Sequence, residues 1–484
     1  MKLTKSFLAS SWWCCIILPS LSLTAQTSFA TASSNNSNNN NDDDTTIPTF
    51  HTSNTQQSAS DYANYFSAYA DLFHQKIMLT DHHRMNAYYN AIQQNRHVFK
   101  DKVVMDVGSG SGILAVWAAK AGAKRVYAVE YTDMAKHARN VVRANGLEDV
   151  VTVIQGAVED VVIPSGDWER FDLKMEEEDD DDGDSAVHEK EECRNGAAQD
   201  DNDASIMSSC KKQQQQQSKV VDIIISEWMG YFLLRESMLD SVIRARDMFL
   251  KPKSGLLFPS HATMLIAPIM NANDHAMVLK EYQEGMVEWN EYLINLKKQY
   301  GVDMSVLTEE YDKEQNEYYL MSSHYVQLED DVILAEPVVV KTLDLAVCTL
   351  EDAKGVGETA FSFDIESSEG GDDEINGFAG WFTVDFQSRT DEVGRKFGPK
   401  MKNPIHFSSS PEIGETHWGQ QAFYLPSAIP IQRNSKMKID GTMEMFRSKE
   451  SARLYNVKFR YTVAAAVDGS YNAMDPVESV YKIP

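Results

Sequence analysis

Two glutamates that follow one predicted strand are the residues of this chain best suited to chemistry. Glu227 and Glu236 lie nine residues apart with Gly230 between them, so a turn of the chain could direct both carboxylates to one point. Burying two carboxylates beside aromatic residues costs much free energy unless a cation neutralises them. A planar guanidinium matches a carboxylate through two parallel hydrogen bonds, and we therefore predict that this pair binds an arginine side chain.

The stretch Val104–Gly112 predicts a cofactor site after another strand. Its glycines, Gly108 and Gly110 among them, permit a tight turn and let a ligand approach the backbone. Glu130 ends the next predicted strand and could accept hydrogen bonds from both hydroxyls of a ribose. The last two glycines are separated by one residue, whereas the dinucleotide fingerprint has two there, and Asp106 places a carboxylate beside the turn. These features favour S-adenosylmethionine, a nucleoside with a cationic tail, over a nicotinamide cofactor or a purely structural turn.

Alternating strands and helices must position both groups. Short apolar runs predict strands at 102–107, 125–130, 150–155 and 221–226, with helical patterns at 113–121 and 133–144. This alternation predicts a mostly parallel, doubly wound sheet, in which ligands bind at the carboxyl ends of the strands. Upstream of the sheet, residues 61–94 carry apolar side chains at helical spacing.

The half of the chain after Pro259 has a different pattern. Runs rich in β-branched and aromatic residues predict antiparallel strands at 261–267, 332–340, 380–386 and 457–465, and therefore a second, β-rich domain. Residues 275–300 return to helical spacing, and Gly301 is a plausible stop. The aromatic residues of this helix need a cover. A partner subunit or the helix's own domain could provide it, and we favour a partner.

Length and composition limit the remaining possibilities. A chain of 484 residues is long enough for two domains. With 72 acidic and 45 basic residues its net charge is −27, which disfavours nucleic acid as the principal partner. An acidic surface suits a cationic partner, although solubility alone explains it equally well. The five cysteines form no disulfide framework and no zinc-ligand spacing, so we expect no metal.

Three segments are predicted to lie outside the folded body. Residues 1–32 follow the charged, apolar, small-residue order of a secretory signal peptide, and their apolar run is too short and interrupted to span a membrane. Residues 33–60 are rich in Asn and Ser and indicate a disordered linker. The acidic stretch 167–219 is predicted to be a disordered insertion in a surface loop.

From about Tyr62 to the C-terminus, apart from that insertion, the sequence resembles the protein arginine methyltransferases, most closely the plant-type branch called plant arginine methyltransferase ten. The motifs that carry the resemblance are Tyr65–Tyr69, Val104–Gly112, Glu130, Glu227–Met238 and Thr416–Gln420. The resemblance implies a Rossmann-like domain that binds S-adenosylmethionine at 61–260. It also implies a β-barrel-like domain at 261–484 with a helical dimerisation arm at 271–322.

The resemblance also implies roles for individual residues. Glu227 and Glu236 would grip the substrate guanidinium, Tyr69 would lie over it, and His417 would pair with Asp81. Met78 and Met238 would shape the space that accepts the methyl group. Arg84 would pair with the carboxylate of the cofactor, and Gln75 stands where relatives often carry a cofactor-contacting His, which leaves its role open. The implied cofactor-binding residues are Tyr65, Met78, Arg84, Asp106, Gly108, Gly110, Glu130, Val158 and Glu159.

The activity implied by the resemblance is methylation of guanidinium nitrogens of protein arginines, giving monomethyl and asymmetric dimethylarginine. Met78 and His417 match the branch that makes the asymmetric product. The implied assembly is a homodimer, and the implied substrates are Arg-Gly-rich or histone tails. The family implies the cytoplasm or nucleus, whereas the signal-like segment favours the secretory pathway or an organelle. The alternative is a catalytically silent scaffold of the same fold that binds basic proteins.

Overall fold

The structure is a computed structural model that describes residues 66–67, 69–163, 219–366, 373–389, 398–431, 435–467, 470–473 and 475–483. These residues all fall within one unit of the chain, Thr52–Pro484. The signal-like segment, the linker, Tyr65 and all but the last residue of the acidic insertion lie outside the described residues.

A five-stranded parallel sheet forms the first half of this unit. Its strand order is β3-β2-β1-β4-β5, and every neighbouring pair is parallel. The strands are β1 (Val103–Val107), β2 (Arg125–Glu130), β3 (Val151–Gln155), β4 (Ile223–Ile225) and β5 (Leu256–Phe258). The doubly wound sheet predicted from the sequence is confirmed, with β5 added. The chain order reverses between β1 and β4, which is where such sheets open a ligand crevice.

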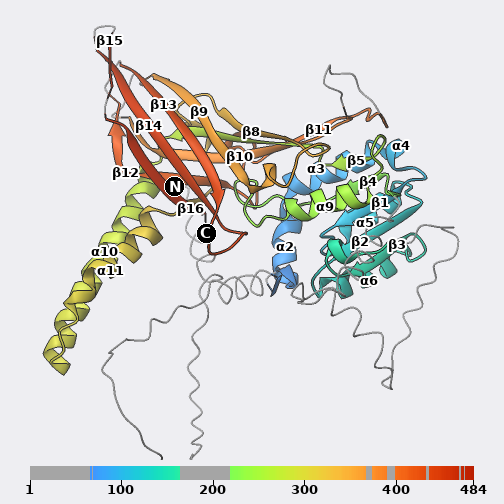
Figure 1. The fold of residues 1–484 in the computed structure, drawn as a ribbon, viewed down its shortest axis with the longest axis horizontal. Helices are drawn as coiled ribbons and strands as arrows, with labels where there is room; N and C mark the ends of the chain where they lie inside the picture. The colour runs from blue at the N-terminus through green and yellow to red at the C-terminus, as the bar shows by residue number, and fades with distance from the viewer. Residues whose placement is uncertain are drawn as a thin grey trace, which may run out of the picture. The chain divides into compact units, whose positions relative to one another are not determined.

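Helices α5 (Ile113–Lys120), α6 (Met134–Ala144) and α9 (Leu239–Phe249) pack against this sheet (Figure 1). Every residue of β1 is buried, as is typical of a parallel strand covered on both faces. Gly112 begins α5 with a left-handed backbone (φ 81°), so the tight turn after β1 is completed at a position that glycine adopts easily.

The helical pattern at 61–94 is divided into two helices in its described part, α2 (Leu72–Thr80) and α3 (His82–Gln93), with the short α4 (Arg96–Phe99) after them. Asp81 separates α2 from α3 because its backbone is extended. Its carboxylate accepts a hydrogen bond of 2.9 Å from the backbone N–H of Arg84 and so caps α3. Helical spacing continues across this residue, and the pattern alone therefore does not show the break.

Two antiparallel sheets form the second half of the unit. One has the order β7-β12-β10-β6-β8 with β11 paired to β10, and the other has the order β15-β14-β13-β9 with β16 paired to β14. The strands of the first are β6 (His261–Ile269), β7 (His324–Val326), β8 (Val338–Asp344), β10 (Glu374–Phe386), β11 (Ile405–Ser408) and β12 (Gln420–Pro430). Those of the second are β9 (Gly355–Glu366), β13 (Lys436–Arg447), β14 (Tyr455–Val467), β15 (Ser470–Ala473) and β16 (Val477–Ile483).

The two antiparallel sheets pack face to face, which confirms the barrel-like second domain. Phe378 of β10 stacks on Phe459 of β14 with ring centroids 4.9 Å apart. The predicted strand at 332–340 is wrong in its first half. A 3-10 turn occupies Asp330–Val332, and β8 begins only at Val338.

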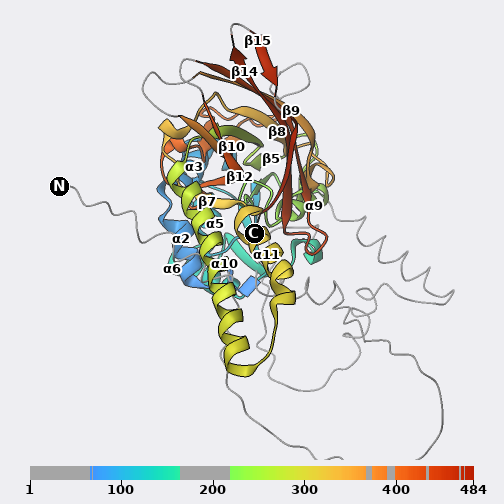
Figure 2. The same cartoon turned by 90° about the vertical axis from the view of Figure 1, so that its left-hand side faces the viewer.

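A helical segment extends from the second domain (Figure 1). It contains α10 (Ala272–Tyr300), which ends at Gly301 as predicted, α11 (Thr308–Gln315) and the π-helical turn Asn316–Leu320. In Figure 2, α10 and α11 lie side by side. Trp289 stacks on Tyr311 of α11 at 4.1 Å, so the chain itself covers this aromatic residue. None of the helices in the described part of the chain is long and apolar enough to cross a membrane.

Asn95, fully buried after α3, joins the two halves of the unit. Its amide nitrogen donates to the carbonyls of Ala91 (3.1 Å) and Asn403 (2.7 Å). Its amide oxygen accepts from the backbone N–H groups of Lys402 (3.0 Å) and Asn403 (3.1 Å). One side chain therefore satisfies four backbone groups, three of them in the loop before β11.

We predict that Asn95→Ala destabilises the protein because it leaves buried backbone groups without partners. The free energy of unfolding should fall by about 2–3 kcal/mol, measured by urea unfolding of the full chain. Asn86→Ala, an exposed position on α3, is the matched control and should change it by less than about 0.5 kcal/mol. Equal stabilities of the two variants would contradict the assigned role of Asn95.

Candidate active site

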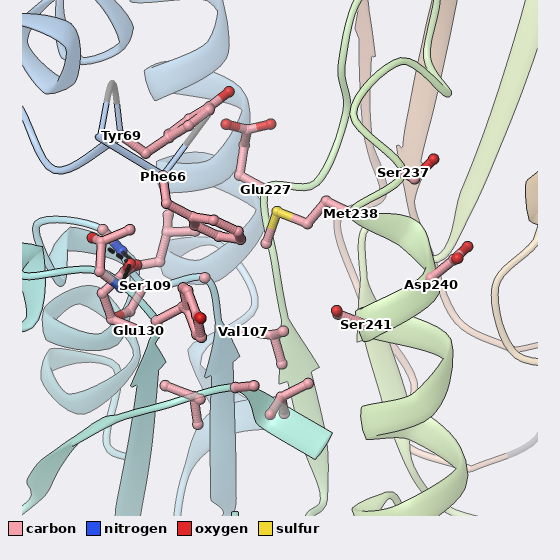
Figure 3. Close-up of a pocket in the computed structure, with 18 of the residues that line it drawn as sticks. Phe66, Tyr69, Val107, Ser109, Glu130, Glu227, Ser237, Met238, Asp240 and Ser241 are labelled. Carbon is pink, nitrogen blue, oxygen red and sulfur yellow. Dashed lines mark hydrogen bonds between the residues drawn. The ribbon is translucent and has the colours of Figure 1, made fainter. Parts of the chain in front are cut away.

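A cavity of about 490 Å³ lies at the carboxyl ends of β1, β2 and β4. Figure 3 shows Phe66, Tyr69 and Glu227 at one end of it, with Met238 entering from the start of α9. Of the residues predicted from the sequence to bind cofactor or substrate, those that line it are Tyr69, Met78, Arg84, Gly108, Gly110, Glu130, Val158, Glu159 and Glu227.

The glycine turn after β1 has no room for side chains. A Cβ at Gly108 would lie 2.1 Å from the terminal methyl of Met238, and one at Gly110 would lie 2.9 Å from Oε1 of Gln75. Both glycines also have positive φ angles, 70° and 52°. Gln75 in turn donates a hydrogen bond of 3.3 Å to the carbonyl of Tyr69. The residue whose role the sequence left open thus connects the glycine turn to Tyr69.

Glu130 is held in place by the chain around it. Its Oε2 accepts from the backbone N–H of Gly110 (2.8 Å), and its Oε1 accepts from the backbone N–H and the hydroxyl of Thr132 (2.8 and 2.7 Å). A carboxylate has about four acceptor positions, and these bonds use three of them. The remaining position, on Oε2, suits a hydroxyl of a ligand in the cavity.

Asp106 is fully buried but does not line the cavity. Its Oδ2 accepts from the backbone N–H of Ala115 in α5 at 3.0 Å, and its Oδ1 has no hydrogen-bond partner within the described ranges. Burial, together with a smaller contribution from the charge of Glu130, raises the pKa of Asp106 to about 7, although the hydrogen bond from Ala115 opposes this shift. Asp106 therefore stabilises the glycine turn from the buried side and not from the cavity.

Glu227, just after β4, forms a buried ion pair with Arg84 of α3. Arg84 Nη2 lies 2.9 Å from Glu227 Oε2, and the two side chains are only 10% and 11% exposed. Arg84 Nη1 also donates to the carbonyl of Met78 at 2.9 Å. Glu227 Oε1 and Arg84 Nε are both buried and have no hydrogen-bond partner in the part of the chain that the structure describes. Each member of the pair thus keeps capacity for a further polar contact.

Glu227 and Glu236 both lie in residues 227–238, a hairpin closed by an antiparallel bridge between Gly230 and Leu233, which we call the glutamate hairpin. The backbone of Glu236 is in the left-handed region. Its φ is 84° and that of Ser237 is 57°. Gly230 allows the hairpin to close, because a Cβ there would lie 1.8 Å from the carbonyl oxygen of Arg235. The hydroxyl of Tyr69 donates to Glu236 Oε2 at 2.8 Å, although Glu236 itself does not line the cavity.

His417 and Asp81 meet as the resemblance implied. His417 Nδ1 lies 2.8 Å from Asp81 Oδ2, and the backbone N–H of His417 donates to the same oxygen at 2.9 Å. Burial lowers the pKa of His417, and the hydrogen bond to Asp81 opposes this only in part. Burial alone would raise the pKa of Asp81, but hydrogen bonds from His417 and from the backbone of Arg84 hold it below 3.8. The pair therefore consists of a neutral imidazole that donates to a carboxylate.

Several further residues line the cavity. Phe66 and Ser237 lie within the motifs Tyr65–Tyr69 and Glu227–Met238, although the sequence predicted no role for them. The sequence did not indicate Ser241 and Arg244, which lie on α9, or Arg453, which lies in the turn between β13 and β14. Ser241 donates to Oε1 of Glu159 at 2.9 Å. Serine and arginine at these positions form no motif, so the local sequence carried no signal for them. Within the described segments, no group of three or more His, Cys, Asp or Glu side chains is placed to hold a metal ion.

Comparisons with known proteins agree with this architecture. Residues 262–466 match the family model described as the arginine methyltransferase oligomerization subdomain, and residues 81–173 match that of the ribosomal protein L11 methyltransferase (PrmA). The rice (Oryza sativa subsp. japonica) protein arginine N-methyltransferase PRMT10 is 38% identical over 403 residues, which cover 83% of this chain and 88% of the relative. The Arabidopsis thaliana protein of the same name is 38% identical over 408 residues, covering 84% and 88%.

A solved structure is also similar to this chain over its whole length. The crystal structure of Arabidopsis thaliana protein arginine methyltransferase 10, described as a uniquely open conformation, has a TM-score of 0.69 and 35% identity, covering 87% of this chain and 100% of that one. The chain therefore belongs to the protein arginine N-methyltransferase family. The resemblance to its plant-type branch is confirmed.

The raised pKa of Asp106 predicts a pH-dependent stability. The pKa of Asp106 is near 7 in the folded protein and 3.8 ordinarily, so its protonation stabilises the fold fully below pH 3.8. This stabilisation decreases as the pH rises from 3.8 and is lost as the pH passes through 7. Asp106→Asn removes this dependence. From about pH 5.5 to about pH 8.5, wild type should lose up to about 2 kcal/mol of unfolding free energy relative to the variant. Urea unfolding at both pH values measures this, and a constant difference would show that Asp106 is ionised throughout.

Proposed function

We propose that this chain transfers methyl groups from S-adenosylmethionine to guanidinium nitrogens of arginines in proteins. One observation carries the proposal. The hairpin after β4 presents Glu227 in the wall of the cavity and holds Glu236 where Tyr69 bonds its carboxylate, and Gly108 and Gly110 line the same cavity. Two carboxylates at the carboxyl end of a parallel sheet suit a planar cation.

The residues present fit S-adenosylmethionine. Glu130 would bind the ribose through its open acceptor position, Glu159 and Val158 would bind the adenine, and Arg84 would bind the carboxylate of the methionine part. The backbone of Gly108 and Gly110 would accommodate the ligand without a clash. When bound, this cofactor supplies an activated methyl group on a sulfonium centre.

The two glutamates orient the substrate and polarise it. An arginine side chain is a poor nucleophile because its positive charge is delocalised and its pKa exceeds about 12. Carboxylates on one edge of the guanidinium draw that charge toward them and leave the lone pair of the other terminal nitrogen free. Arg84 pairs with Glu227 at 2.9 Å and fixes its position, and Tyr69 fixes the direction of Glu236. Positioning therefore supplies most of the catalysis.

No strong base is needed before transfer. The guanidinium loses its proton once a nitrogen has been alkylated, and a carboxylate of the hairpin can accept it. The neutral imidazole of His417, hydrogen-bonded to Asp81, is a second acceptor near the site. Met78 in the cavity wall supports the asymmetric dimethyl product, since an unbranched thioether leaves space for a methylated nitrogen. The presence of His417 in the chain supports the same product through the resemblance to the family branch that makes it.

We also propose that the enzyme works as a homodimer on basic tails, either Arg-Gly-rich or from histones. The match to an oligomerization subdomain supports this. So do the exposed apolar side chains of the helical segment, among them Val287, Tyr292 and Ile294. Trp289, by contrast, is half-buried and already stacks on Tyr311 of α11. The net charge of −27 suits cationic substrates.

The proposal is tested by methyl transfer from labelled S-adenosylmethionine to an Arg-Gly-rich peptide, followed by hydrolysis and identification of the methylarginine. The full-length wild type should yield asymmetric dimethylarginine. Glu236→Gln keeps an acceptor for Tyr69 but removes the charge, and it should lower kcat about 100-fold while cofactor affinity changes less than about 3-fold. The exposed Glu412→Gln is the control and should match wild type.

Undiminished transfer by Glu236→Gln would contradict the assignment of Glu227 and Glu236 as a clamp that binds the substrate guanidinium. A wild type that binds the cofactor and the peptide but transfers no methyl group would instead support a catalytically silent scaffold.

A further inference from the structure

Glu236 and Ser237 are two of the four residues of the glutamate hairpin that have side chains and a left-handed backbone. Glu236 and Ser237 both have side chains, and successive positive φ angles are sparsely populated for such residues. Within the hairpin, the N–H of Gly230 donates to the carbonyl of Leu233 at 3.0 Å, and the N–H of Ser237 donates to the carbonyl of Leu234 at 3.2 Å. The N–H of Glu236, the residue that carries the carboxylate, instead donates to a residue outside the hairpin.

The turn between β13 and β14, residues 448–454, supports this backbone from the second domain. The N–H of Glu236 donates to the carbonyl of Arg453 at 3.0 Å, and Arg453 Nη1 donates back to the carbonyl of Glu236 at 2.7 Å. Ser237 Oγ donates to the carbonyl of Ala452 at 2.5 Å and lies 3.0 Å from the hydroxyl of Tyr455. Arg453 thus binds both backbone polar groups of Glu236.

Arg453 also contacts the N-terminal part of the site. Its guanidinium lies over the ring of Phe66, 5.0 Å from the centroid, and both residues line the cavity. Phe66 in turn packs on Tyr131 at 4.4 Å, next to the end of β2. One side chain therefore joins the second domain, the glutamate hairpin and the segment just before Tyr69.

The supporting turn is itself anchored to the first domain. Arg447, at the end of β13, donates to Asp240 of α9 at 2.7 Å and to the hydroxyl of Tyr455 at 2.9 Å. Tyr455 is 1% exposed, and its hydroxyl is 3.0 Å from the carbonyl of Ala353. The turn is thus fixed at both ends, which makes Arg453 a rigid support for Glu236.

We propose that Arg453 is a positioning residue for methyl transfer, which fixes where the Glu236 carboxylate lies while Tyr69 fixes its orientation. This inference rests on the proposed function. Arg453 acts through Glu236 and holds its backbone. Misplacing a catalytic group by a fraction of its hydrogen-bond length lowers turnover without abolishing binding.

The test compares Arg453→Met, Arg453→Lys and Lys449→Met in the full-length protein. Lys449 is exposed on the same turn, so its variant removes an equal charge without touching the hairpin. Three quantities are measured for each variant: kcat and KM for an Arg-Gly-rich peptide, the Kd of S-adenosylhomocysteine by titration, and the Tm.

Arg453→Met should lower kcat about 10-fold or more, with less than about 3-fold changes in peptide KM and in the Kd. Arg453→Lys retains the charge and a hydrogen-bond donor but loses the planar guanidinium with its several N–H donors, and it should lower kcat by about 3-fold. Phe66→Leu, which removes only the ring under the guanidinium, should have a milder effect than Arg453→Met. Lys449→Met should match wild type in all three quantities.

If the wild type is active and Arg453→Met has the same kcat as Lys449→Met, the inference about Arg453 is overturned while the proposed function stands. A fall in Tm and cofactor affinity with unchanged kcat per folded molecule would also overturn it, because that result indicates a merely structural contact. Should Arg453→Met fail to fold, an Arg453→Lys variant with wild-type kcat overturns the inference by itself. A wild type that binds cofactor but methylates no arginine removes the proposed function and this inference with it.

Discussion

The buried ion pair between Arg84 and Glu227 is the interaction on which the rest of the site depends. Each charge lies in a cavity wall with little exposure to solvent, and removing either would leave the other uncompensated. Arg84 reaches Glu227 because Asp81 ends α2 and caps α3, and Asp81 is held by His417 of the second domain. A line of contacts from one domain to the other therefore fixes the first glutamate of the clamp.

A second line of contacts reaches the other glutamate. Tyr69 bonds the carboxylate of Glu236, and Arg453 of the second domain bonds its backbone. Neither domain alone supplies all the contacts that hold Glu227 and Glu236. The glycine turn and Glu130, in contrast, belong wholly to the parallel sheet and its loops. The cofactor half of the site is thus built by local structure, and the substrate half by contacts between domains.

This division explains what could be predicted from the sequence. The strands of the parallel sheet, the glycine turn and the stop at Gly301 have local signals, namely apolar runs and residues that permit left-handed backbone. Local signals do not mark the break at Asp81, since helical spacing continues across it. They also do not mark the late start of β8 at Val338, since apolar residues precede it. The pairing of Arg84 with Glu227 joins residues 143 positions apart, and that of Arg453 with Glu236 joins residues 217 apart. Such contacts follow from the tertiary fold, which local spacing does not specify.

The central claim is that two carboxylates recognise the charge of a guanidinium. Its most direct test is a calorimetric titration of the full-length protein with two peptides in the presence of S-adenosylhomocysteine. One peptide carries arginine, and the other carries citrulline, its neutral isostere, at the same position. The account predicts that the arginine peptide binds at least about 10-fold more tightly, as expected for hydrogen bonds between charged groups. Equal affinities would show that the glutamates do not bind the substrate cation, and would contradict the account.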